Sequence, residues 1–148
     1  MADEDVRETH YWLYSPGEGA CKWEAFCKRG VMGLGWSEIG DLTQFSSQDE
    51  MRDAMKSAID QTKSHDSGAR ATWQFLKEMK VGDVIFAKRG RHTLIGRGVV
   101  TSRYIYDPSS DAEYPHIREV DWTSKKECKY PGLAAMRILC IQIGRAHV

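Results

Sequence analysis

Residues 79–106 read MKVGDVIFAKRGRHTLIGRGVVTSRYIY, and this stretch decides the fold. Residues 80–83 form a turn, and the apolar residues over 84–88 that follow it predict a strand. Residues 89–92 predict a hairpin turn that leads into a long second strand over 93–106. Two glycines interrupt this second strand and are expected to kink it. The stretch therefore predicts a strongly bent hairpin at the centre of a larger sheet.

The flanking segments supply further strands and helices. The polar–apolar alternation of the strands and the helical spacing of the apolar residues distinguish the two kinds of element. Together they predict an α+β fold, in which a bent mixed sheet forms a partly closed barrel with helices packed outside. Strands are predicted over residues 10–15, 31–36, 117–122 and 137–141, and helices over residues 20–28, 69–79 and from the capping box at Ser47 to Ile59.

The composition is that of one globular domain. The chain has 148 residues, of which 41% are hydrophobic and 28% charged, and its formal net charge is zero. This balance argues against disorder and gives no overall attraction to nucleic acid or membrane. No apolar run approaches the roughly 20 residues that span a bilayer, and the acidic start is unlike a signal peptide. We therefore expect a soluble cytoplasmic protein with no membrane partner.

The two ends of the chain are set apart from the domain. We expect residues 1–9 to be an acidic, flexible N-terminus and residues 10–142 to form the folded domain. Residues 143–148, IGRAHV, match the translation of a common sequencing adapter, so we expect them to be an artefact. On this interpretation the domain is the N-terminal part of a longer protein.

Sequence motifs for catalysis or metal binding are missing. No GxSxG, HExxH or P-loop pattern occurs, and the histidines lie in different predicted elements. The cysteines form no CxxC pair, which favours free thiols in a reducing cytosol over the alternatives of a disulfide or a metal site. We expect a binding domain without a cofactor, and not an enzyme. The cysteines are Cys21, Cys27, Cys128 and Cys140.

Basic residues are concentrated in and around the central hairpin. Between residues 77 and 103 there are seven Lys and Arg residues against two acidic ones, although the whole chain is neutral. Nucleic-acid phosphates attract such local clusters and are bound through Lys and Arg side chains. The expected contacts to a nucleic-acid backbone are Lys88, Arg89, Arg91, Arg97 and Arg103.

Tryptophan is unusually frequent, with five residues in this short chain. A nucleobase held between aromatic faces gains about 1–3 kcal/mol from stacking. Trp36, which follows a glycine-rich strand, is the tryptophan that we expect to contact a base. Trp12 and Trp73 are expected in the core, and for Trp23 and Trp122 both interpretations stay open.

Six short motifs, in this order and spacing, resemble an EVE domain. EVE domains belong to the PUA-like superfamily with the YTH domains, and the resemblance is greatest to the N-terminal modules of McrB-type modification-dependent restriction ATPases. It covers residues 10–141. The motifs are Tyr11-Trp12-Leu13, Gly33-Leu34-Gly35-Trp36, Met79-Lys80-Val81-Gly82-Asp83-Val84, Gly96-Arg97-Gly98-Val99, Tyr104-Ile105-Tyr106 and His116-Ile117-Arg118-Glu119-Val120-Asp121-Trp122.

The resemblance implies a pocket that takes a flipped, modified base into an aromatic cage. A tryptophan followed by serine matches one cage wall of YTH domains, and a tyrosine after the central glycine-containing strand supplies the second. A tryptophan of the first helix is the candidate third wall, and an aspartate would accept a hydrogen bond from a base N–H. The asparagines that YTH domains carry near the first strand have no clear match. The tryptophan and serine are Trp36 and Ser37, the tyrosine is Tyr104 or Tyr106, the helix tryptophan is Trp23 and the aspartate is Asp41.

The resulting expectation is a reader of modified bases in DNA, such as N6-methyladenine or 5-methylcytosine. It would act as the specificity module of a restriction or defence protein, together with an AAA-type or nuclease effector. The alternative is a modified-RNA-binding module of the PUA or YTH kind, for which the same pocket would serve. A small-molecule enzyme or ligand-binding domain would need a convergent polar triad, which the sequence does not supply.

Overall fold

The structure of the chain is a computed structural model that describes residues 8–129 and 141–143. Most of the expected acidic N-terminus, the start of the strand predicted over 137–141, and residues 144–148 lie outside the described residues. Ile143, which we expected to belong to the tail, pairs with Tyr14 in the last strand. The strands are β1 (Tyr11–Tyr14), β2 (Val31–Leu34), β3 (Val84–Arg89), β4 (Thr93–Val100), β5 (Ile105–Tyr106), β6 (His116–Ser124), β7 (Cys128–Lys129) and β8 (Ile141–Ile143).

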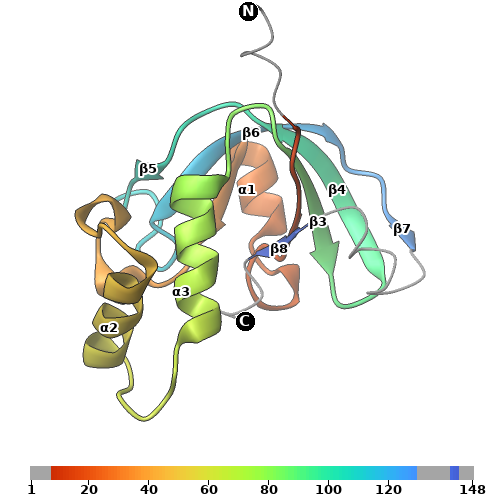
Figure 1. Ribbon diagram of the computed structural model, residues 1–148. Coiled ribbons are helices and arrows are strands. Elements are labelled where there is room, and N and C mark those ends of the chain that lie inside the picture. Colours follow the sequence, from red (N-terminus) through yellow and green to blue (C-terminus); the bar gives the residue numbers. More distant parts are fainter. Residues whose placement is uncertain (1–7, 130–140, 144–148) are drawn as a thin grey trace, which may run out of the picture.

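The eight strands form one mixed sheet that curls into a half-barrel. Their order is β2-β6-β4-β3-β1-β8, with β5 beside β6 and β7 beside β4. β1 runs parallel to β3 and β8, whereas the remaining pairs are antiparallel. The sheet arches over α1 (Trp23–Arg29), while α2 (Gln48–Ala58) and α3 (Asp66–Trp73) pack together at one side (Figure 1). The predicted α+β class and bent mixed sheet with flanking helices are confirmed.

The glycines of β4 admit large side chains from neighbouring elements. A side chain at Gly96 would collide with the indole of Trp23, and one at Gly98 would collide with Trp122. The two indoles meet edge to face, with ring centroids 4.7 Å apart and an interplanar angle of 83°. The register between β4 and β6 also shifts between Arg97 and Gly98. The expected bend is therefore present, and it allows α1 to approach the sheet closely.

The helices begin close to where the sequence predicts them. The hydroxyl of Ser47 accepts a hydrogen bond from the N–H of Glu50 at 3.1 Å, which caps α2. The reciprocal half of the capping box is displaced, because the carboxylate of Glu50 accepts from Ser46 instead. α3 starts three residues before the predicted Ala69 and continues into a π-helical turn, η5 (Gln74–Glu78). Short 3-10 turns are η2 (Glu18–Ala20), η3 (Ser37–Ile39) and η4 (Leu42–Gln44).

The long strand predicted over residues 93–106 is divided into two. β4 ends at Val100, and β5 resumes at Ile105 on the same partner strand, β6. Between them the carbonyl of Ser102 accepts a hydrogen bond from the guanidinium of Arg118 at 3.0 Å. A side-chain contact, which local periodicity does not encode, therefore interrupts this strand.

The buried apolar side chains form two clusters. The larger lies beneath the sheet and includes Trp12, Tyr14 and Phe75, whereas the smaller lies between α2, α3 and the 3-10 turns. Trp36 and Tyr104 are half-buried and pack against both clusters. These two side chains therefore mark the junction between the half-barrel and the helical pair. No helix in the described part of the chain is long and apolar enough to cross a membrane.

Candidate functional site

Trp36 occupies a left-handed backbone conformation two residues after Leu34, the last residue of β2. Its φ of 59° and ψ of 43° are uncommon for a residue with a side chain and end the strand two residues earlier than predicted. Its carbonyl accepts a hydrogen bond from Nε2 of His116 at 3.1 Å. The indole packs on α3, where a side chain at Gly68 would come within 3.1 Å of its Nε1. Trp36 is thus fixed through both its backbone and its ring.

His116 connects Trp36 to Tyr104 through a chain of hydrogen bonds. The N–H of Leu42 donates to the hydroxyl of Tyr104 at 3.1 Å, so that hydroxyl donates in turn to Nδ1 of His116 at 2.8 Å. Nε2 of His116 then carries the proton donated to the Trp36 carbonyl. These hydrogen bonds require a neutral imidazole, because Nδ1 of His116 accepts a hydrogen bond and Nε2 alone carries a proton. The His116 side chain is fully buried.

Two tyrosines stack on the same imidazole. The ring centroid of Tyr104 lies 5.8 Å from that of His116, with an interplanar angle of 28°. The corresponding values for Tyr106 are 5.7 Å and 30°. Tyr106 is 37% exposed, so it presents one aromatic side chain of this group to solvent. The structure therefore brings together Trp36, Tyr104 and Tyr106, which the sequence placed in one site, and adds His116 at their centre.

The two polar residues of the expected site also lie near this group. Ser37 is half-buried and begins η3 next to Trp36. The carboxylate of Asp41 accepts hydrogen bonds from the backbone N–H and the hydroxyl of Thr43 at 2.9 and 2.8 Å. This contact caps η4, so Asp41 has a structural role that accounts for its position in a turn.

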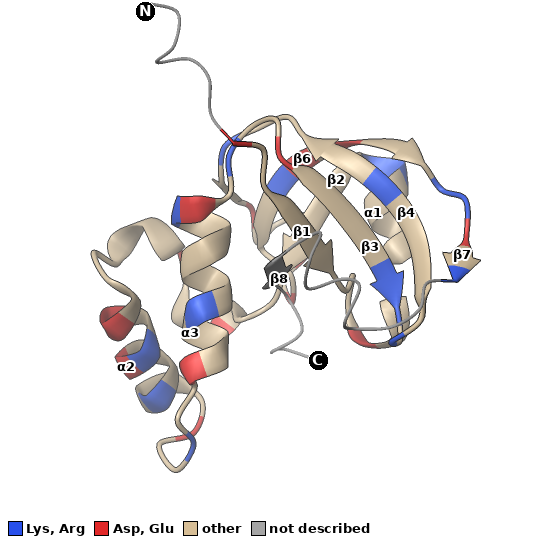
Figure 2. Cartoon of the chain, turned by 45° about the vertical axis from the view of Figure 1, so that its right-hand side comes forward, with Lys and Arg blue, Asp and Glu red and all other residues tan. Residues whose placement is uncertain are grey.

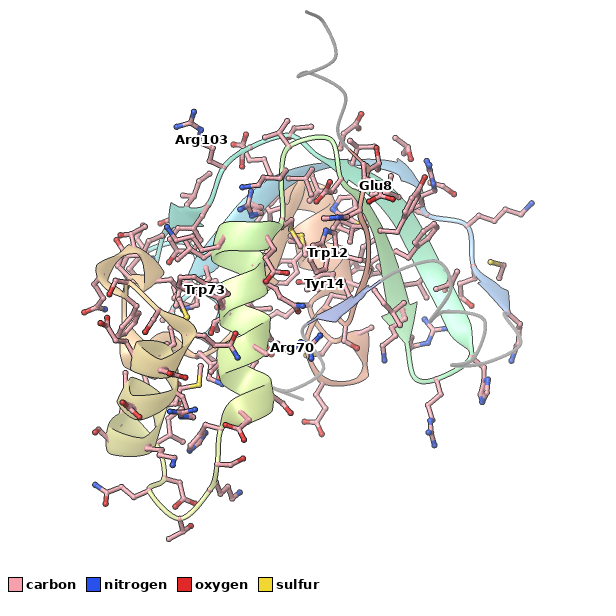
Figure 3. The ribbon with its side chains drawn as sticks, viewed as in Figure 1. Glu8, Trp12, Tyr14, Arg70, Trp73 and Arg103 are labelled. Carbon is pink, nitrogen blue, oxygen red and sulfur yellow. The ribbon has the colours of Figure 1, made fainter. Side chains whose placement is uncertain are left out.

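Trp23, the expected third wall, lies elsewhere. It packs on Gly96 and Trp122. Trp122 is six residues along β6 from His116, which is about 20 Å in an extended strand. The expectation for Trp23 is corrected: its indole fills the space above the β4 glycines. Trp73, expected in the core, is half-buried beside the smaller cluster (Figure 3), whereas Trp12 is fully buried as expected.

A cleft opens on the other side of Tyr104, between the end of η5 and the loop that follows β4. Its volume is about 560 Å³, within the range of roughly 300–1,000 Å³ that is typical of ligand pockets. Four of its nine lining residues are cationic and none is acidic. The lining residues are Thr43, Leu76, Lys77, Met79, Lys80, Val81, Arg103, Tyr104 and Arg118.

Arg118 forms the buried floor of this cleft and joins its two walls. Its guanidinium donates to the carbonyls of Phe75 at 2.9 Å and Leu76 at 3.2 Å, at the end of η5, and to that of Ser102 at 3.0 Å. The same group lies over the Phe75 ring, 5.6 Å from its centroid. Burial lowers the pKa of Arg118 to about 10, and the charge of Asp83 acts in the opposite direction, so the side chain stays cationic at neutral pH.

The hairpin residues expected to bind phosphate are only partly available. Lys88 is buried, and its amine donates to the carbonyl of Gly90 at 3.2 Å, within the turn. Arg89 is exposed and forms an ion pair with Glu127 at 2.8 Å. Arg91 is exposed at the tip of the turn. Lys88 is therefore corrected to a turn-stabilising residue.

The other two expected phosphate contacts lie at different places. The guanidinium of Arg97 lies 6.0 Å from the centroid of the Phe86 ring, on the face of β3 and β4, beside a smaller pocket of about 210 Å³. Arg103 instead borders the cleft beside Tyr104. Figure 2 shows basic segments at the free end of the β3–β4 hairpin and also where η5 leads into β3, and Figure 3 shows Arg103 pointing outward from the loop after β4. The expected single basic surface is thus divided.

The sequence interpretation missed His116, Arg118, Lys77 and Lys80 as site residues. A detectable signal existed for the two lysines, which lie three residues apart at a helix end directly before a turn. No sequence signal distinguishes Arg118 from a surface arginine, although it is buried together with His116 and Ile117 at the start of β6. Its role depends on which segments the fold brings beside that strand.

Metal binding has no support in the described residues. In that part of the chain, no group of three or more His, Cys, Asp or Glu side chains could hold a metal ion. Cys21 and Cys128 are free and exposed, and Cys27 is free and half-buried, whereas Cys140 lies outside the described residues. Burial is the main cause that raises the pKa of the Cys27 thiol.

Acidification is expected to destabilise the fold through His116. Burial lowers the pKa of this imidazole, and its hydrogen bond to Trp36 and the charge of Asp41 oppose that effect only in part. The unfolded chain then binds the proton near the ordinary pKa of about 6.5 before the native state does, so stability falls as the pH drops below that value. The slope for one proton is at most about 1.4 kcal/mol per pH unit.

The measurement is urea unfolding of the wild type and of His116→Gln between pH 7.5 and 5. Glutamine does not titrate, so the variant is expected to lose less stability on acidification than the wild type. Parallel pH profiles for the two proteins would contradict the assignment, whatever their absolute stabilities.

The chain matches a protein-family model, whereas no curated protein matches its sequence. The family model described as Domain of unknown function (DUF8426) matches residues 12–133, which include all the aromatic and cationic site residues described above. The chain therefore belongs to the DUF8426 family.

Proposed function

We propose that this domain binds nucleic acid and takes an unstacked, modified base into the cleft beside Tyr104. The observation that carries the proposal is the convergence of a stacked aromatic group and a cationic cleft on one side chain, Tyr104. Stacking holds a flat base, and cationic side chains hold the phosphates next to it. The aromatic group around His116, with Trp36 and Tyr106, forms the supporting wall.

The energies are compatible with a base-flipping reader. Extracting a base from a duplex costs a few kcal/mol, and least at a weakened pair. Stacking contributes about 1–3 kcal/mol per base, and phosphate contacts add to it. One buried methyl group contributes only about 0.8 kcal/mol. Selectivity for a modified base must therefore come mainly from the shape of the cleft or from a hydrogen bond that the unmodified base cannot make.

The resemblance to EVE domains supports the finer assignment. The half-barrel with flanking helices agrees with the PUA-like architecture that this resemblance implies. On that basis we propose modified DNA as the ligand and an AAA-type or nuclease effector as the partner that acts on it. The domain is proposed as the specificity module, without a catalytic step of its own.

The experiment is a binding titration with matched, labelled oligonucleotides. Each oligonucleotide is unmodified or carries N6-methyladenine, 5-methylcytosine or 5-hydroxymethylcytosine. Each one is prepared as DNA and as RNA. At least one modified DNA is expected to bind about tenfold more tightly than its unmodified counterpart, or about 1.4 kcal/mol. Tighter binding of a modified RNA would assign the domain to RNA instead. Equal affinity for every oligonucleotide would overturn the reader proposal.

Removal of one aromatic wall is expected to abolish this discrimination. Trp36 does not line the cleft, but Trp36→Ala removes packing from the clusters that hold Tyr104 beside it, so modified and unmodified oligonucleotides are expected to bind alike. Because Trp36 also packs between two clusters, thermal unfolding of the variant is measured alongside. Trp23→Ala is the matched control, since it removes an equally large, half-buried indole that lies on α1 against Trp122, far from His116. A Trp23 variant that loses discrimination, with a Trp36 variant that keeps it, would contradict the site.

A further inference from the structure

We propose that the cations bordering the cleft, Lys77, Lys80 and Arg103 above the buried Arg118, bind the nucleic-acid phosphate backbone, and that the β3–β4 hairpin does not. The identity of the ligand rests on the function proposed above. The location rests on the charge and hydrogen-bonding state of the side chains themselves. The subsite would take phosphodiester groups on the sugar side of the base held at Tyr104.

The first observation concerns the unused donors of Arg118. A guanidinium has five N–H donors, and the bonds to three carbonyls use three of them. Among the described residues this leaves one N–H on each of the two terminal nitrogens for another acceptor, on a side chain that is only 4% exposed and lines the cleft. Buried donors are nearly always satisfied in native proteins. A phosphate oxygen in the cleft would satisfy them and would also compensate a buried positive charge.

The second observation concerns the three cations at the rim. Within residues 8–129 and 141–143, Lys77, Lys80 and Arg103 form no ion pair with a carboxylate. The amine of Lys80 donates to the carbonyl of Lys77, at 3.0 Å, and that of Lys77 lies 5.8 Å from the Trp73 ring centroid. No carboxylate of the described residues therefore neutralises the positive charge at the rim.

The hairpin offers a weaker site by the same criteria. Lys88 is buried in its own turn, and Arg89 is neutralised by Glu127. A phosphate at Lys88 or Arg89 would have to displace an existing partner, whereas the described residues place no carboxylate against the rim cations of the cleft. The cleft also places positive charge within reach of an aromatic ring, as recognition of a nucleotide requires.

The experiment compares two charge-matched double variants. Lys80→Ala with Arg103→Ala removes two cations from the rim, and Arg89→Ala with Arg91→Ala removes two from the hairpin. All four side chains are exposed, so both double variants are expected to fold. Thermal unfolding of each variant tests this expectation. The probes are a labelled single-stranded abasic oligonucleotide, which offers phosphates without bases, and the best-binding modified oligonucleotide of the same length.

The rim variant is expected to bind the abasic probe about tenfold more weakly at low salt. The slope of the logarithm of its affinity against the logarithm of the salt concentration should become shallower by about 1.4, because each of the two lost single-strand phosphate contacts contributes roughly 0.7. The hairpin variant is expected to stay within twofold of the wild type, with an unchanged slope.

The two proposals fail in different ways. Losses that are equal in both variants, or larger in the hairpin variant, would overturn the cleft subsite while leaving the reader function standing. Rim-dependent binding of the abasic probe without preference for any modified base would overturn the reader function while leaving the cleft subsite standing. A wild type that binds neither probe at low salt would overturn both proposals.

Discussion

Replacing Asp83 by alanine is expected to lower the free energy of unfolding by about 3–5 kcal/mol. This carboxylate is fully buried and accepts hydrogen bonds from the indole of Trp12 and the N–H of Lys80, both at 2.9 Å. It also accepts a longer bond from the N–H of His10 at 3.3 Å. Alanine would leave these buried donors without an acceptor. Urea unfolding monitored by tryptophan fluorescence measures the loss.

Asp83→Asn is the control that separates shape from hydrogen bonding. The two shorter bonds converge on one oxygen, which the asparagine carbonyl can supply, whereas the amide group would face the weaker donor. We expect a loss of about 1–2 kcal/mol, since of these three donors only the N–H of His10 would lose its acceptor. Alanine and asparagine variants of equal stability would show that the carboxylate is not needed as an acceptor.

Replacing Arg118 by methionine is expected to cost about 2–4 kcal/mol of stability, because three carbonyl groups lose a charged donor. The carbonyls of Phe75 and Leu76 belong to one wall of the cleft, and that of Ser102 belongs to the other. The variant is therefore also expected to bind the abasic oligonucleotide more weakly, through loss of both a cation and the spacing of the walls. Urea unfolding and titration of the same preparation measure the two effects.

Arg118→Lys keeps the charge but cannot reach three carbonyls from one planar group. It is expected to recover part of the affinity for the abasic probe and less of the stability. A methionine variant as stable as the wild type would show that the clamp contributes nothing, and undiminished binding would remove Arg118 from the phosphate subsite.

Local patterns predicted the elements well and their ends less well. The hairpin of residues 84–100 and the first helix lie where their periodicity and glycines indicate, because both signals act within a few residues. Strand β2 ends earlier than predicted because Trp36 adopts a left-handed conformation that a distant histidine stabilises. The long strand was divided at Ser102 for a similar reason, a contact from Arg118. Such contacts join segments far apart in the sequence.

For the candidate site, too, the sequence predicted residue types and order but not the contacts between distant segments. Trp36, Tyr104 and Tyr106 were identified by residue type and order, and they do converge. Trp23 was misplaced because the sequence gives no indication that Gly96 admits its indole. The basic residues were assigned to the hairpin because they are close in sequence, whereas the cleft collects Lys80, Arg103 and Arg118 from three separate segments. Sheet order decides this grouping, and local sequence patterns do not predict sheet order.

The parallel pairing of β1 with β3 also has a consequence for how the chain folds. Tyr11 pairs with Val84, so a large loop must close before this part of the sheet exists. Loop closure costs entropy that is repaid only after the contact forms, and sheets built from such distant pairs fold slowly, in about milliseconds to seconds. The helical pair and the β3–β4 hairpin contain mostly local contacts and can form earlier. During synthesis, β1 leaves the ribosome before β3 and must wait for it before finding its place in the sheet.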